Sequence, residues 1–291
     1  MTGPDRLDPP CATVGIVGLG LVGGSIALRL RATWPDVQVI GLDRRRVIQE
    51  AVRAGVIHGY RTALGDLAEC DLVVLATPVP VILELIEEAS AEHLTCVITD
   101  VGSTKRLITA AAARGGLTGF VGGHPMAGSE HSGMNHARAG LFEGRPWLIV
   151  AGDHAPAAAI AMVDRFVRGL GAEPRRLDAT AHDRVMAYVS HVPQLVASAL
   201  MTTAGQRCGS AGFQACGPAF GEMTRVAGSP FDSWRGTLAT NADFVAEALE
   251  AFISRLPSAS ALREGSELAT LFAEAQHWRA EFASVLARGR L

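Results

Sequence analysis

The stretch "VGIVGLGLVGGS", residues 14–25, decides the fold of this 291-residue chain. An apolar, β-rich run leads into Gly18, Gly20 and Gly23, whose spacing is G-x-G-x-x-G, and an apolar helical segment follows. A second β-rich run, "VQVIGLD", ends in Asp43, 20 residues after Gly23. A strand, a glycine turn, a helix and a second strand that ends in an acid together predict a dinucleotide site.

This turn predicts where each part of the dinucleotide lies. The pyrophosphate is expected on the helix N-terminus, against Gly18, Gly20, Leu21, Val22 and Gly23. Asp43 can hold both ribose hydroxyls and would repel a 2′-phosphate, which favours NAD over NADP. The arginines that follow, beginning with Arg44, keep NADP open because a guanidinium can bind that phosphate. The segment "ATP", residues 76–78, ends another strand, so Thr77 and Pro78 are expected to face the nicotinamide half.

The pattern along the chain predicts two domains. Strand-like and helix-like segments alternate from Thr13 to about Asp178, which indicates a mostly parallel sheet with helices on both faces. Later segments repeat apolar residues at i, i+3 and i+4 and contain no convincing strand. We therefore expect an α/β Rossmann-like domain at residues 11–178 and an all-α domain at residues 179–291. The helical half carries more amphipathic surface than a small domain readily buries, which predicts a homodimer.

Composition narrows the class of protein. The net charge is −3, so we expect no nucleic-acid partner. No uninterrupted apolar run reaches the ~18 residues of a membrane span, so we expect no membrane partner. Five scattered cysteines without a CxxC pair are typical of free thiols in a reducing cytosol, which predicts a cytoplasmic protein. The 26 basic residues include one lysine, Lys105, so a mechanism that needs a lysine has one candidate.

Two polar stretches follow neighbouring strands of the predicted sheet. They are "DVGSTK", residues 100–105, and "GHPMAGSEHSG", residues 123–133. Because carboxyl ends of parallel strands meet at one edge, Ser103 and His124 should face the same crevice. A histidine beside a hydroxyl can accept the proton of a substrate alcohol while hydride leaves the carbinol carbon for a nicotinamide. The sequence therefore predicts Ser103 and His124 as catalytic residues of a dehydrogenase acting on a small molecule.

From Thr13 to about Asn241, the chain resembles the prephenate and arogenate dehydrogenase family of tyrosine biosynthesis. The resemblance lies in "GLGLVGGS", "ATPV", "DVGSTK", "HPMAGSEHSG", "LFEGRPWLIV", "SHVPQ" and "SPFDSW". It implies a helical dimerisation domain and NAD-dependent oxidative decarboxylation of prephenate to 4-hydroxyphenylpyruvate, without a metal. His124 would then accept the proton or hydrogen bond of the ring 4-hydroxyl, Ser103 would orient it, and loss of CO₂ would make the ring aromatic.

The resemblance also implies substrate-binding residues. Arg225, nine residues before Trp234, would bind a substrate carboxylate through its planar guanidinium. Trp234 corresponds to a tryptophan that reaches the partner subunit's site, and Glu130 to an acid at the pocket mouth. His191 is a further substrate-binding candidate, although a buried, satisfied histidine is an equal alternative. Gln194 replaces a histidine of many members, and its neutral amide weakly favours prephenate over the ammonium of arogenate.

Other functions remain open at this point. The enzyme could be an arogenate dehydrogenase or a cyclohexadienyl dehydrogenase of dual specificity. A β-hydroxyacid dehydrogenase is less favoured, because it needs a catalytic lysine in the helical domain and no lysine follows Lys105. A dinucleotide-sensing regulator would need an effector module, and no basic helix-turn-helix is evident. The adjacent His182 and Asp183 are interpreted as a pair at a helix N-terminus.

Overall fold

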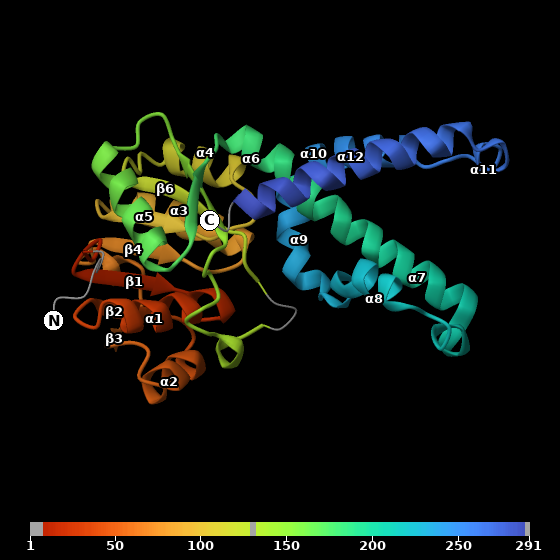
Figure 1. Cartoon of the computed structure of the whole chain (residues 1–291). Coiled ribbons are helices and arrows are strands. Elements are labelled where there is room, and N and C mark those ends of the chain that lie inside the picture. Colours follow the sequence, from red (N-terminus) through yellow and green to blue (C-terminus); the bar gives the residue numbers. More distant parts are fainter. Residues whose placement is uncertain (1–7, 129–131, 289–291) are drawn as a thin grey trace.

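The computed structural model of the chain describes residues 8–128 and 132–288 (Figure 1). Its N-terminal half is an eight-stranded sheet of order β3-β2-β1-β4-β5-β6-β7-β8. All neighbouring strands run parallel except β6 and β7, which are antiparallel. The strands are β1 (Thr13–Val17), β2 (Gln38–Leu42), β3 (Gly59–Tyr60), β4 (Leu72–Leu75), β5 (Val97–Asp100), β6 (Phe120–Pro125), β7 (Pro146–Ala151) and β8 (Glu173–Arg176).

Helices cover both faces of the sheet, as parallel strands joined by crossovers require. Buried side chains of α1, α2 and α5 pack on one face, and those of α3 and α4 pack on the other. These helices are α1 (Leu21–Thr33), α2 (Arg45–Arg53), α3 (Val79–Ala91), α4 (Arg106–Arg114) and α5 (Ala157–Gly169). Short 3-10 turns lie at Gly65–Leu67 and Met134–His136. The predicted α/β class with a mostly parallel sheet is confirmed.

Sequence reasoning missed the two edge strands, β3 and β8. β3 has two residues, and β8 reads "EPRR", so neither shows the apolar pattern of a buried strand. Pro174 lies within β8, where an edge position tolerates the lost N–H donor. Both strands are held by backbone pairing to one neighbour, which leaves no signature in the side chains.

The described residues after β8 form only helices, so the predicted all-α second half is confirmed. They are α6 (Ala179–Met186), a π-helical segment (Ala187–His191), α7 (Val192–Phe213), α8 (Pro218–Thr224), a 3-10 segment (Arg225–Gly228), α9 (Phe231–Thr240), α10 (Ala242–Ser254), α11 (Ala261–Glu264) and α12 (Ser266–Arg288). Asp178 caps α6, its carboxylate accepting the N–H of Ala181 at 2.8 Å. Figure 1 shows this half extending away from the sheet.

The helical half buries little of its own apolar surface. Its core has five buried residues, Ala187, Val192, Phe244, Val245 and Ala248. Many large apolar side chains are exposed, among them Val189, Met223, Phe231, Ile253, Phe272 and Trp278. By length and composition the continuous helix over residues 179–213 could cross a membrane, but helices of soluble proteins meet the same test, so this is weak evidence. Exposed apolar surface of this extent indicates an interaction face.

Candidate active site

The glycine turn between β1 and α1 has the geometry of a phosphate cradle. Gly18 has φ +92°, and a Cβ there would lie 2.6 Å from the carbonyl oxygen of Ala76. A Cβ on Gly23 would lie 1.9 Å from the carbonyl oxygen of Gly18, so α1 packs directly on the turn. A Cβ on Gly20 would meet nothing within 4 Å. The turn is therefore tightly packed at Gly18 and Gly23 and open at Gly20, where a phosphate can approach the N-terminus of α1.

Asp43, just beyond β2, is held in front of this turn by backbone amides. Its Oδ2 accepts the N–H of Leu19 at 2.7 Å, and its Oδ1 accepts the N–H of Arg44 at 2.6 Å. The exposed Arg44 guanidinium lies 3.8 Å from the same carboxylate. A carboxylate has about four lone-pair positions, so two remain for the hydroxyls of a ligand.

A crevice of about 490 Å³ lies at the carboxyl edge of the sheet and is bordered on one side by α9. Thr77 Oγ1 in its wall is buried and has no hydrogen-bond partner among the described residues. The lining includes Gly20, Leu21, Val22, Thr77, Pro78, Ser103 and Trp234. A second hollow, of about 800 Å³, opens beside Asp43 between α2 and the segment after β3, with Arg45 and Arg61 in its wall. The glycine turn, Asp43 and Ser103 thus share one edge of the sheet, whereas His124 is not among the described residues that line the crevice.

Two histidines and an aspartate form a hydrogen-bonded chain at the carboxyl end of β6. Asp183 Oδ1 accepts from His182 Nδ1 at 2.8 Å, and His182 Nε2 lies 2.9 Å from His124 Nδ1. A carboxylate only accepts, so the proton of neutral His182 is on Nδ1 and its Nε2 is an acceptor. His124 must then donate through Nδ1. This assignment leaves Nε2 of His124 with a free lone pair.

The surroundings keep both histidines neutral and Asp183 ionised. Burial lowers the pKa of His124 well below its ordinary value, and nearby His182 and Lys105 add to this. Burial also lowers the pKa of His182, although Asp183 opposes the shift. Burial would raise the pKa of Asp183, but hydrogen bonds from His182 and two backbone amides bring it below its usual range. The chain is thus a neutral base supported by a buried anion.

Lys105 is buried and structural. Its ammonium pairs with Asp100, and both side chains are fully buried. Asp100 Oδ1 accepts the N–H of Gly123 at 3.0 Å, and Oδ2 accepts that of Gly102 at 2.8 Å. Burial lowers the pKa of Lys105, against the attraction of Asp100. Asp100 thus fixes Gly123, the residue before His124, relative to the end of β5, and Lys105 neutralises Asp100. The one lysine of the chain therefore has a structural role in this site.

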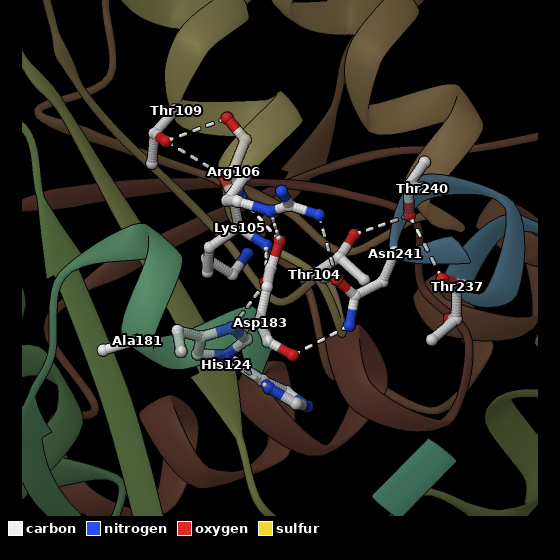
Figure 2. A network of polar contacts seen from close by, with 12 residues as sticks. Thr104, Lys105, Arg106, Thr109, His124, Ala181, Asp183, Thr237, Thr240 and Asn241 are labelled. Atoms are coloured by element: carbon white, nitrogen blue, oxygen red, sulfur yellow. Dashed lines mark hydrogen bonds and ion pairs between the residues drawn. The ribbon is translucent and has the colours of Figure 1, made fainter. Parts of the chain in front are cut away.

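Asp183 also joins the two halves of the molecule (Figure 2). Its carboxylate accepts the backbone N–H groups of Lys105 and Arg106, at 2.6 and 3.0 Å, at the N-terminus of α4. Arg106 in turn pairs with Asp243 on α10 through Nη1 and Oδ2 at 2.8 Å. The interpretation of His182 and Asp183 as a capping pair is therefore incomplete: Asp183 does cap a helix, but the helix is α4 across the domain junction.

The remaining predicted residues lie on the helical half or at its border. Ser103 lines the crevice, but no hydrogen bond joins it to His124 in the described part of the chain. Buried His191 packs edge-on against Trp234 of the same chain, at 6.1 Å between ring centroids. Gln194 Nε2 donates to the carbonyl of Val226 at 2.9 Å, beside exposed Arg225, and lies 3.3 Å from Ser198 Oγ. Glu130 falls outside the described residues.

Sequence reasoning overlooked His182, Asp183 and Asn241 as parts of the site. Asn241 is fully buried and bonds to the carbonyl of Asp183 at 2.8 Å. Each of the three acts through a contact with a distant segment, which a local motif does not reveal. The one available signal was the adjacent ionisable pair His182 and Asp183 near the start of a predicted helix.

A nucleotide cradle and a neutral histidine at the same edge of a Rossmann-like sheet are typical of an oxidoreductase. Residues 26–174 match the family description "Prephenate dehydrogenase, nucleotide-binding domain", and residues 178–274 match "Prephenate dehydrogenase, dimerization domain". The chain belongs to the prephenate dehydrogenase family.

Three relatives illustrate the range of that family. The chain is 32% identical over 255 residues to the prephenate dehydrogenase of Lactococcus lactis, covering 83% of this chain and 68% of the relative. The solved prephenate dehydrogenase of Aquifex aeolicus, in complex with hydroxyphenyl propionate and NAD⁺, has a TM-score of 0.83 at 28% identity, covering 93% and 98%. Synechocystis arogenate dehydrogenase has a TM-score of 0.78 at 26% identity, covering 94% and 99%. The relatives therefore include enzymes named for two substrates.

Proposed function

We propose that this chain catalyses the NAD-dependent oxidative decarboxylation of prephenate to 4-hydroxyphenylpyruvate in tyrosine biosynthesis, with arogenate as the alternative substrate. The observation that carries this proposal is the free lone pair on His124 Nε2, at the edge of the sheet that holds the nucleotide cradle. A neutral, half-buried imidazole with a fixed tautomer can serve as the general base that oxidation of an alcohol needs. Membership of the family supplies the substrate class.

The cradle fits an NAD molecule. The open face at Gly20 would take the pyrophosphate, and Asp43, next to Arg44, would take the ribose hydroxyls. The Thr77 hydroxyl, which has no partner in the described part of the chain, and its neighbour Pro78 would face the nicotinamide half. Leu21 and Val22 would contribute the first turn of α1. When bound, NAD⁺ accepts the hydride from C4 of the substrate ring. The complex of the Aquifex aeolicus enzyme with NAD⁺ supports this choice of cofactor.

His124 would hold the proton released in that oxidation. As hydride leaves C4, the 4-hydroxyl proton moves to Nε2, and His124 becomes an imidazolium. His182 accepts the Nδ1 hydrogen bond of that cation, and ionised Asp183 stabilises the charge through His182. Ser103, in the crevice wall, would orient the hydroxyl. The C1–carboxylate bond then breaks, CO₂ leaves, and its electron pair completes the aromatic ring, while the oxygen on C4 takes back the proton held by His124.

The helical half would hold the carboxylate-bearing end of the substrate. We assign Arg225, Gln194, His191 and Trp234 to this end, and Glu130 to the mouth of the pocket. A guanidinium suits a carboxylate because it offers two parallel donors. Two copies of the chain would associate through the helical half, since most of the exposed large apolar side chains lie there and residues 178–274 match a dimerization domain. We expect this homodimer in the cytoplasm.

The orientation of Gln194 changes how it can act on substrate choice. Its Nε2 faces the Val226 carbonyl and Ser198, so both amide hydrogens are directed at protein atoms. The amide therefore offers a ligand only its oxygen, which accepts hydrogen bonds. Such an oxygen can receive an ammonium but cannot donate to a keto group. The preference for prephenate inferred from a neutral Gln194 is thus not reinforced by its orientation, and both substrates have to be compared directly.

The test is NAD⁺ reduction by the purified protein with prephenate and arogenate side by side. We expect NADH together with 4-hydroxyphenylpyruvate from prephenate, and a lower kcat/KM for arogenate with tyrosine as the product. A strong preference for arogenate would mean that arogenate, and not prephenate, is the substrate. No NADH from either substrate would refute the proposed function.

A further inference from the structure

Asn241, between α9 and α10, is oriented by two contacts that agree. Its Oδ1 accepts from Nη2 of Arg106 at 3.3 Å, and its Nδ2 donates to the carbonyl of Asp183 at 2.8 Å. A guanidinium only donates and a carbonyl only accepts, so exchange of the amide oxygen and nitrogen would spoil both contacts. Asn241 is fully buried, which makes such an exchange costly. The position of its NH₂ group is therefore determined.

The same NH₂ group determines the tautomer of His191. Asn241 Nδ2 lies 3.2 Å from His191 Nδ1 and can only donate to it. His191 Nδ1 must then be an acceptor, so the proton of the neutral ring is on Nε2. That N–H is buried and has no hydrogen-bond acceptor among residues 8–128 and 132–288. An N–H donor in this state requires an acceptor from elsewhere.

His191 stays neutral in its surroundings. Burial lowers its pKa to about 4, and nearby His182 adds to this while Asp183 opposes it. These two groups and His124 are the titratable neighbours that bear on the ring. At neutral pH the ring thus carries one proton, and Asn241 decides which nitrogen holds it.

The backbone presents this histidine in an unusual way. His191 ends the π-helical segment Ala187–His191, and Pro193 follows within the first turn of α7. Proline cannot donate to a preceding carbonyl, so a regular α-helix is interrupted here. Single π-turns occur often at functional sites. The ring packs edge-on against Trp234, whose side chain lines the crevice with Ser103. His191 thus contacts a ring that lines the crevice in which the substrate would bind.

We propose that Asn241 is a positioning residue: it fixes the His191 proton on Nε2, and this N–H donates to a carboxylate oxygen on C1 of the substrate ring. The inference rests on the proposed function for the identity of the acceptor. In the proposed function His124 contacts the 4-hydroxyl of the substrate, and C1 lies opposite C4 in the ring. A donor on the helical half is therefore placed for the opposite end, and Trp234 must shift to admit the substrate oxygen.

The first measurement needs no substrate. In the free protein labelled with ¹⁵N-histidine, NMR should show His191 protonated on Nε2 and unprotonated on Nδ1. In Asn241→Asp, a carboxylate that accepts from Nδ1 should move the proton there. A wild-type ring protonated on Nδ1 would overturn the role of Asn241, whether or not the enzyme has the proposed activity.

The second measurement separates positioning from structure. His191→Leu should raise the KM for prephenate about ten- to hundredfold and change kcat less, as expected for loss of a hydrogen bond to a charged group. His191→Gln keeps a donor near the Nε2 position and should restore most of the affinity. Asn241→Asp as a single change should raise the KM for prephenate. In the His191→Gln background the same change should raise KM little further, because a glutamine has no tautomer to be changed.

The outcomes are distinguishable from a failure of the proposed function. An inactive wild type would refute that function, while the NMR result would still decide the tautomer. An active wild type whose KM is unchanged in His191→Leu would refute the contact with substrate. An equal effect of Asn241→Asp in both backgrounds would assign Asn241 a structural role only. If Asn241→Asp does not fold, judged by circular dichroism, the wild-type NMR spectrum and the comparison of His191→Leu with His191→Gln still decide.

Discussion

The two ends of the crevice are built in opposite ways. At the nucleotide end, one continuous stretch from Val17 to Asp43 supplies the turn, and most contacts are made by its backbone. At the histidine end, side chains from five separate segments form a branched network through side-chain and backbone hydrogen bonds: Asp100–Lys105, His124, His182–Asp183, His191 and Asn241. A turn built from backbone contacts can be altered one residue at a time, whereas a change in one member of a buried polar network alters the hydrogen bonds of the others.

The largest expected effect is therefore at His124, the member of that network whose Nε2 is directed at the substrate in the proposed mechanism. His124→Ala should lower kcat about 10²–10⁴-fold, because the proton of the substrate hydroxyl then has no acceptor. The Kd for NAD⁺ should change little, since the cradle lies on other segments. Steady-state kinetics and a nucleotide titration check both parts.

His154→Ala is the matched control, because His154 is an exposed histidine of the same domain. It should retain wild-type turnover. Unchanged kcat in His124→Ala would remove the proposed base, and an equal loss in both variants would mean that the assay reports general damage.

The next effect concerns a residue that touches no substrate. Asp183→Asn places an amide where His182 Nδ1 and two backbone N–H groups all donate. The amide oxygen cannot serve all three, so its NH₂ group is driven toward His182 and reverses the tautomer. By analogy with the aspartate-to-asparagine change in a catalytic triad, we expect kcat to fall about 10²–10³-fold. The measurement is kcat beside a urea unfolding curve.

Asp243→Asn serves as the control, because Asp243 pairs with Arg106 in the same network but its side chain is 62% exposed. Its kcat should stay close to that of the wild type. If both variants lose activity to the same extent, the loss comes from the domain junction and not from the tautomer of His182.

These two cases show what the sequence could and could not predict. The sheet, the glycine turn and the position of His124 follow from patterns within a few residues, because strand ends and turns are local. The partners of His124 do not, because His182 becomes its neighbour only when α6 docks on the sheet. Likewise, "HD" fits a helix N-terminus locally, yet Asp183 caps α4, 77 residues away in sequence from Arg106. Contacts made by docking lie beyond single-segment reasoning.

Stability should depend on pH because the buried histidines are neutral. An unfolded histidine binds a proton below pH 6.5, while folded His191 does so only below about 4. The free energy of unfolding should therefore fall as pH drops through this window and be fully retained above it. At pH 5 the contribution of His191 is on the order of 2 kcal/mol. Urea unfolding at pH 7 and pH 5 measures it.

The comparison with His191→Gln isolates this contribution, since His124 and His182 remain in the variant. The variant should lose less stability than the wild type between the two pH values. His154→Gln, at an exposed position, should follow the wild type. If wild type and His191→Gln show the same pH dependence, His191 is not held neutral by burial.

The smallest expected effect lies at the nucleotide end, where backbone contacts dominate. Asp43→Ser removes the carboxylate that would hold the ribose hydroxyls, but the serine Oγ can still accept the N–H of Leu19, so the turn should survive. A lost hydrogen bond to a charged acceptor is worth about 1.5 kcal/mol or more, which is roughly tenfold in the KM for NAD⁺. The KM for NADP⁺ should fall, because a 2′-phosphate no longer meets a like charge and Arg44 and Arg45 become available to it.

The ratio of kcat/KM for NAD⁺ to that for NADP⁺ measures this change in cofactor preference, with Asp36→Ser as a control at an exposed carboxylate. A wild type that already prefers NADP⁺ would show that Asp43 faces away from the ribose. A collapse of kcat in Asp43→Ser would show that the nucleotide end is as interdependent as the histidine end.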